Sequence, residues 1–310
     1  MSLSKISRYR TEIMGFATLW VVFYHAPIVF ANILAPIKFI KQISYSSVDI
    51  FFFLSGLGLF YSWNSQKKSL TEFYKTRFLK ILPSYWIVVS IYFLFLFIYQ
   101  NEFSLNNFLS MMLGINFYLY NDKIFWFIPS ILVCYLIFPL IVNFIGFENN
   151  NSLQIIHENL INIIIFALIL SWLITATDFY YLLIFTLRIP IFIIGIYAGY
   201  ILIQKEPVPI FENIKINGII LSLCILLFNL IFALSSSDMR WRLGLFWYPC
   251  IMIAYPLCLT IALFFDYIDN FYSDSIFLKN IKNMFYFFGK YSLQIYLIHV
   301  TAFKILQVNI

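Results

Sequence analysis

The chain has 310 residues, 62% of them hydrophobic and 11% charged, and a net charge of +6. A soluble domain is about 45–50% apolar and about 25% charged, so the composition excludes a soluble protein and predicts a polytopic membrane protein. No dense run of Lys and Arg with interleaved aromatic residues occurs, which argues against nucleic acid as a partner. The four cysteines lie in apolar runs without a CxxC pair, so we expect no disulfide, no metal site and no bound cofactor.

Ten apolar segments are candidates for helices that cross a bilayer, which requires roughly 17–25 residues for each crossing. The first follows Lys5, Arg8 and Arg10 and is too long for the apolar part of a signal peptide. The fourth is short and contains Asn116, which is typical of a half-span or an interfacial helix. The segments are 13–31, 47–63, 79–99, 107–120, 124–145, 160–177, 180–203, 217–235, 243–265 and 284–306.

The connections between these segments are short, so the predicted fold is an all-α integral membrane bundle of about ten transmembrane helices, forming one domain over residues 1–310. Ten crossings place both termini on the same side. Assigning that side to the cytoplasm gives it 12 Lys and Arg residues against 7 outside, the bias expected for cytoplasmic loops. We therefore predict a multi-pass protein of the plasma or inner membrane, in contact with its lipids, with both termini cytoplasmic.

Two histidines lie inside predicted spans, where an ionisable side chain is costly and usually marks a functional site. His25 lies in the first span, within TLWVVFYHAPIVF, slightly outward of the midpoint. Neutral imidazole can accept a proton near physiological pH, so His25 is a candidate general base. The structural alternative is a hydrogen bond to a neighbouring helix, and both interpretations apply equally to His299 in the last span.

Other polar residues interrupt the apolar segments. The charged guanidinium of Arg188 either extends to the membrane surface or holds an anion, such as a phosphate or a developing oxyanion. Asp49 opens the second span, where an acid favours the helix dipole. Ser55 begins a break of small residues, SGLG, that permits close approach of a helix or a ligand. Gly195 and Gly199 form a small-xxx-small pattern that predicts a helix contact.

A basic stretch precedes the third span. In KKSLTEFYKTRFLKILPSYW, the cations Lys75, Arg77 and Lys80 come before an apolar segment that opens with Pro83. Membrane topology alone explains a basic cytoplasmic loop. A cluster of Arg and Lys beside a membrane cavity also suits a phosphate-bearing ligand from the cytosol.

Taken in order, these segments resemble the membrane-bound acyltransferase 3 family. The matching segments are GFATLWVVFYH (Gly15–His25), VDIFFFLSGLGL (Val48–Leu59), RFLKILP (Arg77–Pro83), Trp126-Phe127 with Tyr135 and Pro139, RIPIFIIG from Arg188, and SLQIYLIH (Ser292–His299). Each motif is weak alone, and the ordered set is specific.

One position departs from the family pattern. The family commonly has Arg or Lys eleven residues before the first-helix histidine, and here that residue is Met14. Arg10 lies about one helical turn earlier on the same face, and either Arg10 or Arg188 is a candidate to supply the missing positive charge.

The resemblance implies an enzyme that takes an acyl group, often acetyl, from cytosolic acyl-CoA to a hydroxyl or amine of a glycan or lipid-linked saccharide, often across the membrane. In that scheme His25 is the base and Arg188 the electrostatic stabiliser. The expected residues at the CoA are Arg10, Lys75, Arg77 and Lys80. Further candidates near the acceptor are Asp49, Ser55, Trp126, Tyr296 and His299.

Two other functions compete with the acyltransferase. Intramembrane His and Arg also build the proton relays of transporters, although no inverted repeat is present. A non-catalytic subunit of a glycan-export assembly is the third possibility. Trp126, Trp241 and Trp247 are candidates to stack on sugar rings, whereas aromatic residues are also common at membrane interfaces.

Overall fold

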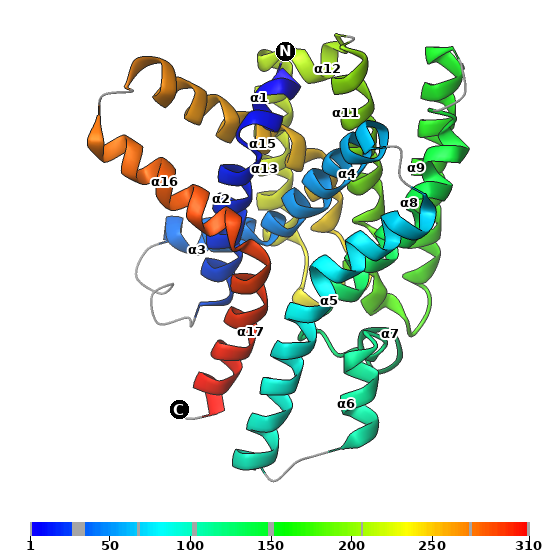
Figure 1. The fold of residues 1–310 in the computed structure, drawn as a ribbon, viewed down its shortest axis with the longest axis vertical. Helices are drawn as coiled ribbons and strands as arrows, with labels where there is room; N and C mark the ends of the chain where they lie inside the picture. The colour runs from blue at the N-terminus through cyan, green and yellow to red at the C-terminus, as the bar shows by residue number, and fades with distance from the viewer. Residues whose placement is uncertain are drawn as a thin grey trace.

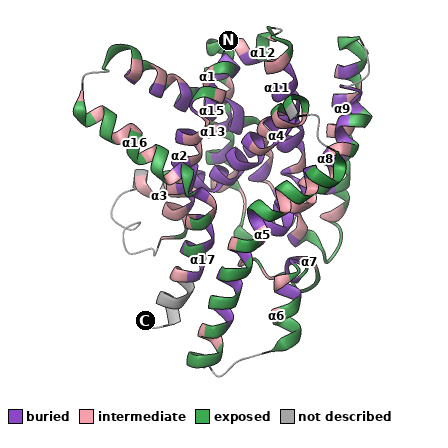
Figure 2. Ribbon diagram, viewed as in Figure 1, coloured by how far each residue is buried: buried purple, intermediate pink, exposed green. Residues whose placement is uncertain are grey.

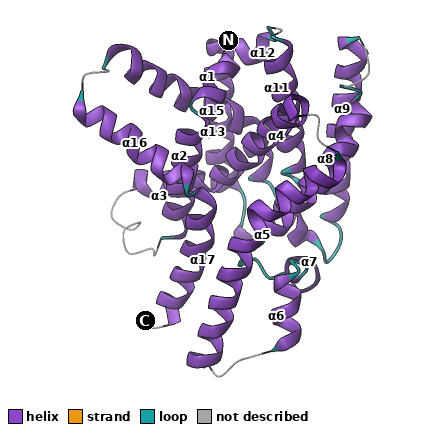
Figure 3. Ribbon diagram, viewed as in Figure 1, coloured by secondary structure: helices purple, strands orange, loops and turns teal. Residues whose placement is uncertain are grey.

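The computed structural model describes residues 2–26, 35–66, 69–100, 104–147, 152–205, 207–272 and 275–308, and within these ranges it contains helices and no strand (Figures 1 and 3). The α-helices are α1 (Ser2–Arg8), α2 (Arg10–His25), α3 (Ala35–Ile43), α4 (Ser47–Gln66), α5 (Leu70–Phe95), α6 (Leu105–Met112), α7 (Asn116–Tyr120), α8 (Phe127–Ile145), α9 (Leu153–Ile174), α10 (Leu183–Thr186), α11 (Ile189–Gln204), α12 (Pro209–Glu212), α13 (Ile214–Leu234), α14 (Ser237–Leu243), α15 (Trp247–Phe271), α16 (Ile276–Lys290) and α17 (Ser292–Val308).

Seven of the described helical segments are long and apolar enough to cross a membrane, and Ser292–Phe303 is a shorter apolar helix. The expected count of about ten is not confirmed. The first predicted span appears as the 16-residue α2, and the part of that span after Ala26 lies outside the described residues. The all-helical membrane architecture itself is confirmed.

The predicted span 107–120 is two short helices, α6 and α7. The chain turns at Gly114, whose φ of +73° lies in the left-handed region, a conformation that favours glycine. Asn116 is buried just after this turn, where its side chain accepts a hydrogen bond from Ser110 Oγ (2.7 Å) and donates to Asp122 Oδ2 (2.8 Å). The polar side chain therefore stabilises a bend and does not sit in a crossing helix.

The predicted span 284–306 is also divided, because the chain turns at Tyr291 between α16 and α17. Helix α16 lies directly against α2, and the two helices touch backbone to backbone at Gly15 and Gly289. A Cβ atom on Gly15 would lie 1.8 Å from the Phe285 carbonyl oxygen, and one on Gly289 would lie 1.8 Å from that of Thr11. Larger residues at either glycine would force the helices apart.

Helices α4 and α11 form the centre of the bundle, where Figure 2 shows mainly buried residues. A Cβ atom on Gly56 would lie 2.2 Å from the Phe192 carbonyl oxygen, and one on Gly195 would lie 2.2 Å from that of Phe53. One on Gly199 would lie 2.8 Å from the Leu57 carbonyl oxygen. The helix contact predicted from the Gly195 and Gly199 pattern is therefore confirmed, and its partner is the SGLG break of α4.

Helix α5 begins at Leu70, about nine residues before the predicted third span. Ser69 and Glu72 form a capping box, in which the Ser69 hydroxyl accepts from the Glu72 amide and the Glu72 carboxylate accepts from the Ser69 amide. This pair satisfies amide groups that the first turn of a helix leaves free. The helix then continues through Pro83. The basic residues before Pro83 consequently lie on a helix, in contrast to the expected loop.

Candidate functional site

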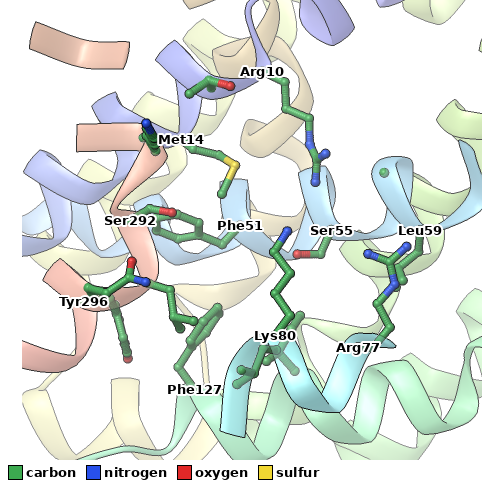
Figure 4. Close-up of a pocket in the computed structure, with 18 of the residues that line it drawn as sticks. Arg10, Met14, Phe51, Ser55, Leu59, Arg77, Lys80, Phe127, Ser292 and Tyr296 are labelled. Carbon is green, nitrogen blue, oxygen red and sulfur yellow. The ribbon is translucent and has the colours of Figure 1, made fainter. Parts of the chain in front are cut away.

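A cavity of about 420 Å³ lies among α2, α4, α5, α8, α16 and α17 (Figure 4). Its lining includes four cationic side chains, Arg10, Arg77, Lys80 and Lys290, and no Asp or Glu among the described residues around it. We call this cavity the basic pocket. Four cations without an acid suit an anionic ligand with several negative groups, since guanidinium and ammonium groups bind phosphates through charge-assisted hydrogen bonds.

The side chain of Arg10 enters the basic pocket from α2, beside Met14 (Figure 4). Its guanidinium lies against Gly58 of α4, so close that a Cβ atom on Gly58 would be 2.5 Å from Arg10 Nη2. Arg10 Nε is buried without a hydrogen-bond partner. Of the two residues proposed to replace the family cation absent at Met14, Arg10 is therefore the one that reaches this pocket.

Two residues of the basic stretch reach the same cavity from α5. Figure 4 shows the Lys80 amine beside Ser55 and the Arg77 guanidinium further along α4. Arg77 donates a hydrogen bond to Ser62 Oγ, and its Nε is buried without an acceptor. Lys75 is exposed and does not line the pocket. The α-helical spacing of three residues between positions 77 and 80 places both side chains on one face.

Lys290 was not among the candidates, because the predicted span 284–306 placed it near its outer end, on the side opposite the cytosol. The turn at Tyr291 changes this, since it lets α16 end at the basic pocket. Tyr135 and Gln294 also line the cavity. The amphipathic character of residues 276–290, with three lysines and two asparagines in IFLKNIKNMFYFFGK, was the available signal for a helix that lies beside the bundle.

The two intramembrane histidines are neighbours, although 274 positions separate them in the sequence. His25 ends α2 and His299 lies on α17, and His299 Nε2 is 3.2 Å from His25 Nδ1. The ring centroids are 5.0 Å apart. His299 is buried at 6% exposure, whereas His25 is exposed. We call these residues the histidine pair.

One aromatic contact separates the basic pocket from the histidine pair. Tyr296 lines the pocket, and its ring centroid lies 4.8 Å from that of Phe127 and 5.4 Å from that of His299. His299 follows Tyr296 by three residues on α17, about one helical turn. Tyr296 and His299 on α17 therefore join the wall of the basic pocket to the histidine pair.

Arg188 lies apart from the basic pocket and is fully buried, with 0% exposure. Its Nε is 3.6 Å from Asp49 Oδ1, and it donates a hydrogen bond to the Ile184 carbonyl. Three aromatic rings surround the guanidinium, with the Cζ atom 5.2 Å from the ring centroid of Tyr45, 5.0 Å from Trp126 and 5.7 Å from Trp247. Arg188 thus pairs with Asp49 instead of extending to the membrane surface.

The three tryptophans considered for sugar stacking differ in their surroundings. Trp126 and Trp247 are buried and their rings lie under Arg188, so these rings are occupied. Trp241 is partly exposed and lies 5.2 Å from Lys123 Nζ. A line of ring contacts leads from His25 through Tyr24 to Tyr45 and on to Trp241. Trp241 is therefore the one of these three tryptophans that is not buried, although Lys123 lies over its ring.

Among the described residues, no group of three or more His, Cys, Asp and Glu side chains is arranged to hold a metal ion. A model of an acyltransferase domain, that of the acyltransferase 3 family, matches residues 15–309. No curated protein and no solved structure gave a significant match. The match covers nearly the whole chain, including both histidines and most of the basic pocket. The chain therefore belongs to the acyltransferase 3 family and is a multi-pass membrane protein.

Proposed function

We propose that the protein transfers an acyl group, acetyl in the first instance, from cytosolic acyl-CoA to a hydroxyl of an exported or cell-envelope saccharide. The observation that carries this proposal is the contact of Tyr296 with both the basic pocket and His299. The wall of the basic pocket and a candidate base are thereby neighbours on α17, so a donor whose phosphates lie among the cations could extend its thioester end toward the histidine pair.

The basic pocket is the proposed donor site. Coenzyme A carries several phosphate charges, and Arg10, Arg77, Lys80 and Lys290 supply matching donors on three different helices. The unpaired Nε atoms of Arg10 and Arg77 are buried donors that lack an acceptor, a costly arrangement that a bound anion relieves. Lys75, which lies outside the pocket, would contribute through long-range attraction.

His25 is the proposed general base, and the exposure of its ring favours it over the buried His299. An acceptor hydroxyl attacks the thioester carbonyl while His25 takes the hydroxyl proton. The tetrahedral intermediate collapses with cleavage of the carbon–sulfur bond, and the imidazolium returns the proton to the CoA thiolate. The products are an ester on the acceptor and free CoA, so atoms and charges balance without a further reactant.

The proposed role of Arg188 is structural support for the site. Its complete burial and its pairing with Asp49 leave no open face toward the basic pocket. The pair joins the first turn of α4, a helix that lines the pocket, to the junction of α10 and α11. Trp126, whose ring lies against Arg188, directly precedes Phe127 of the pocket lining. Loss of the pair would therefore disturb the donor site indirectly.

The proposed orientation has the basic pocket open to the cytosol and the end of α17 on the opposite face. Because 107–120 is not one crossing helix, every later segment changes sides relative to the ten-span prediction. This gathers Lys205, Lys215, Lys279, Lys282 and Lys290 on the side of Arg10, in line with the positive-inside rule.

Two ion pairs support placing α1 and α16 on the same side of the membrane, since Arg8 and Lys282 both contact Asp269, at 3.5 and 2.7 Å. Figure 1 shows the two chain ends at opposite ends of the molecule.

The test is an assay of the purified protein in liposomes with radiolabelled acetyl-CoA and a mixture of saccharide acceptors. Label that appears on a saccharide, in amounts that depend on His25, supports the acyltransferase. Saccharide or proton flux without transfer of label would contradict it and would favour a transporter, whose proton relay the histidine pair also suits. Acyl chain length and acceptor structure follow from the same assay when longer acyl-CoA donors and defined acceptors are supplied.

A further inference from the structure

The histidine pair has a hydrogen-bond pattern that distinguishes its two members. Each Nδ1 atom faces a backbone carbonyl four residues earlier in its own helix. His25 Nδ1 lies 3.0 Å from the Val21 oxygen, and His299 Nδ1 lies 3.2 Å from the Ile295 oxygen. A carbonyl oxygen can only accept, so in the neutral rings both Nδ1 atoms carry the hydrogen and both Nε2 atoms carry a lone pair.

The contact between the rings fits this assignment. His299 Nε2, an acceptor, is 3.2 Å from His25 Nδ1, a donor. The hydrogen on His25 Nδ1 is then shared between the Val21 carbonyl and His299 Nε2. The opposite tautomer of His25 would place its Nδ1 lone pair against two other acceptors at once. His299 therefore favours the form of His25 whose Nε2 has a free lone pair.

The same contact supports His25 after it takes up a proton. Protonation at Nε2 leaves the hydrogen on Nδ1 in place and gives the ring a positive charge. The bond from Nδ1 to His299 Nε2 then becomes charge-assisted and stronger. Because His299 is buried at 6% exposure, water does not compete freely for that acceptor. The buried histidine thus corresponds to the third group that orients a base in other enzymes.

We propose that His299 is a positioning residue, which accepts a hydrogen bond from His25 Nδ1 and so fixes the tautomer in which His25 Nε2 can deprotonate the acceptor hydroxyl. This assignment rests on the proposed acyltransferase function. It gives the two histidines different roles, although both lie in apolar helices.

The kinetic test compares His299→Gln with His299→Leu. The Gln side chain can present its Oε1 as an acceptor to His25 Nδ1, whereas Leu cannot. We expect His299→Leu to lower kcat about tenfold or more, a part of the roughly 10²–10⁴-fold that a general base contributes, and His299→Gln to recover most of that loss. The KM for acetyl-CoA should stay within about twofold, because the basic pocket is separate from the ring pair. Thr301→Val, a buried position on the same helix, serves as the control and should keep wild-type kcat.

Equal kcat in the Leu and Gln variants, whether both wild-type or both reduced, would overturn the proposal.

A spectroscopic measurement tests the proposed tautomer of His25 without an activity assay. The chain has three histidines, so ¹⁵N spectra of histidine-labelled protein in liposomes can be assigned by single substitutions. We expect the His25 ring to carry its proton on Nδ1 in the wild type and to become a tautomer mixture in His299→Leu. A His25 protonated on Nε2 in the wild type contradicts the assignment. An inactive wild type with the expected spectrum would instead refute the proposed function.

Discussion

The guanidinium of Arg10 fills the space that a side chain at Gly58 would need. A Cβ atom there would lie 2.5 Å from Arg10 Nη2 and 2.6 Å from Cζ. Such distances do not occur between unbonded atoms, so a side chain at this position of α4 would push the end of the Arg10 side chain out of its present place. The position of Arg10 on α2 therefore depends on the absence of a side chain at Gly58 on α4.

Gly58→Ala should displace Arg10 and weaken donor binding. A hydrogen bond to a charged group contributes roughly 1.5–3 kcal/mol, so we expect the Kd for CoA to rise about tenfold or more. Gly218→Ala is the matched control, because nothing lies within 4 Å of a Cβ atom on that helical glycine. Calorimetric titration of the purified protein with CoA measures both. An unchanged Kd in Gly58→Ala would show that Arg10 does not contact the donor.

An arginine at position 14 should be able to replace the arginine at position 10 in binding the donor. Both side chains line the basic pocket from the same face of α2 (Figure 4). We expect Arg10→Met to raise the KM for acyl-CoA about tenfold, in line with the loss of one charged hydrogen bond. The double variant Arg10→Met/Met14→Arg should recover at least half of that loss in free-energy terms. No recovery in a folded double variant would mean that the position of the cation, and not its presence, determines binding.

Removal of either partner of the Asp49–Arg188 pair should destabilise the protein. Breaking a buried ion pair on one side leaves an uncompensated charge and costs about 3–5 kcal/mol. We expect Asp49→Ala and Arg188→Ala each to lower the unfolding temperature in detergent markedly, and the double variant to lose less than the sum. Lys5→Ala, which removes a partly exposed partner of Asp266, should cost at most about 1 kcal/mol. Additive losses at positions 49 and 188 would contradict direct coupling.

Cysteine labelling in intact cells tests the orientation. The four native cysteines are buried, so the background from a membrane-impermeant thiol reagent should be low. Met239→Cys on α14 should be labelled and Lys279→Cys on α16 protected until the membrane is opened; both native side chains are exposed. A ten-span arrangement with cytoplasmic termini gives the reverse pattern, so the two topologies exclude one another in this experiment.

Apolar length and composition were sufficient to predict a helical membrane protein, because lipid-embedded helices need long runs of hydrophobic residues. They were insufficient at 107–120 and 284–306, where apolar character is similar on both sides of a turn. Gly114 and Tyr291 interrupt those helices through backbone geometry. The Ser69 and Glu72 capping box was readable from the sequence and marks the true start of α5.

Candidate site residues were found one at a time because each is polar or charged within an apolar chain. The residues that each of them contacts could not be predicted from the sequence in the same way. The pairing of His25 with His299, and of Asp49 with Arg188, joins residues that are 274 and 139 positions apart, and no local pattern encodes such distances. Lys290 was missed for the same reason, since its place depends on how α16 packs against α2.

The backbone contact between Gly15 and Gly289 determines which walls of the basic pocket can move. With no side chains between them, α2 and α16 are packed directly against each other, and they carry Arg10 and Lys290. Helix α5 is different, because only 33% of its apolar window is buried inside the protein. We therefore expect entry of a bulky donor to displace α5, with Arg77 and Lys80, more than α2 and α16. The cations of α5 would then adjust their position to the bound donor, while those of α2 and α16 would keep theirs.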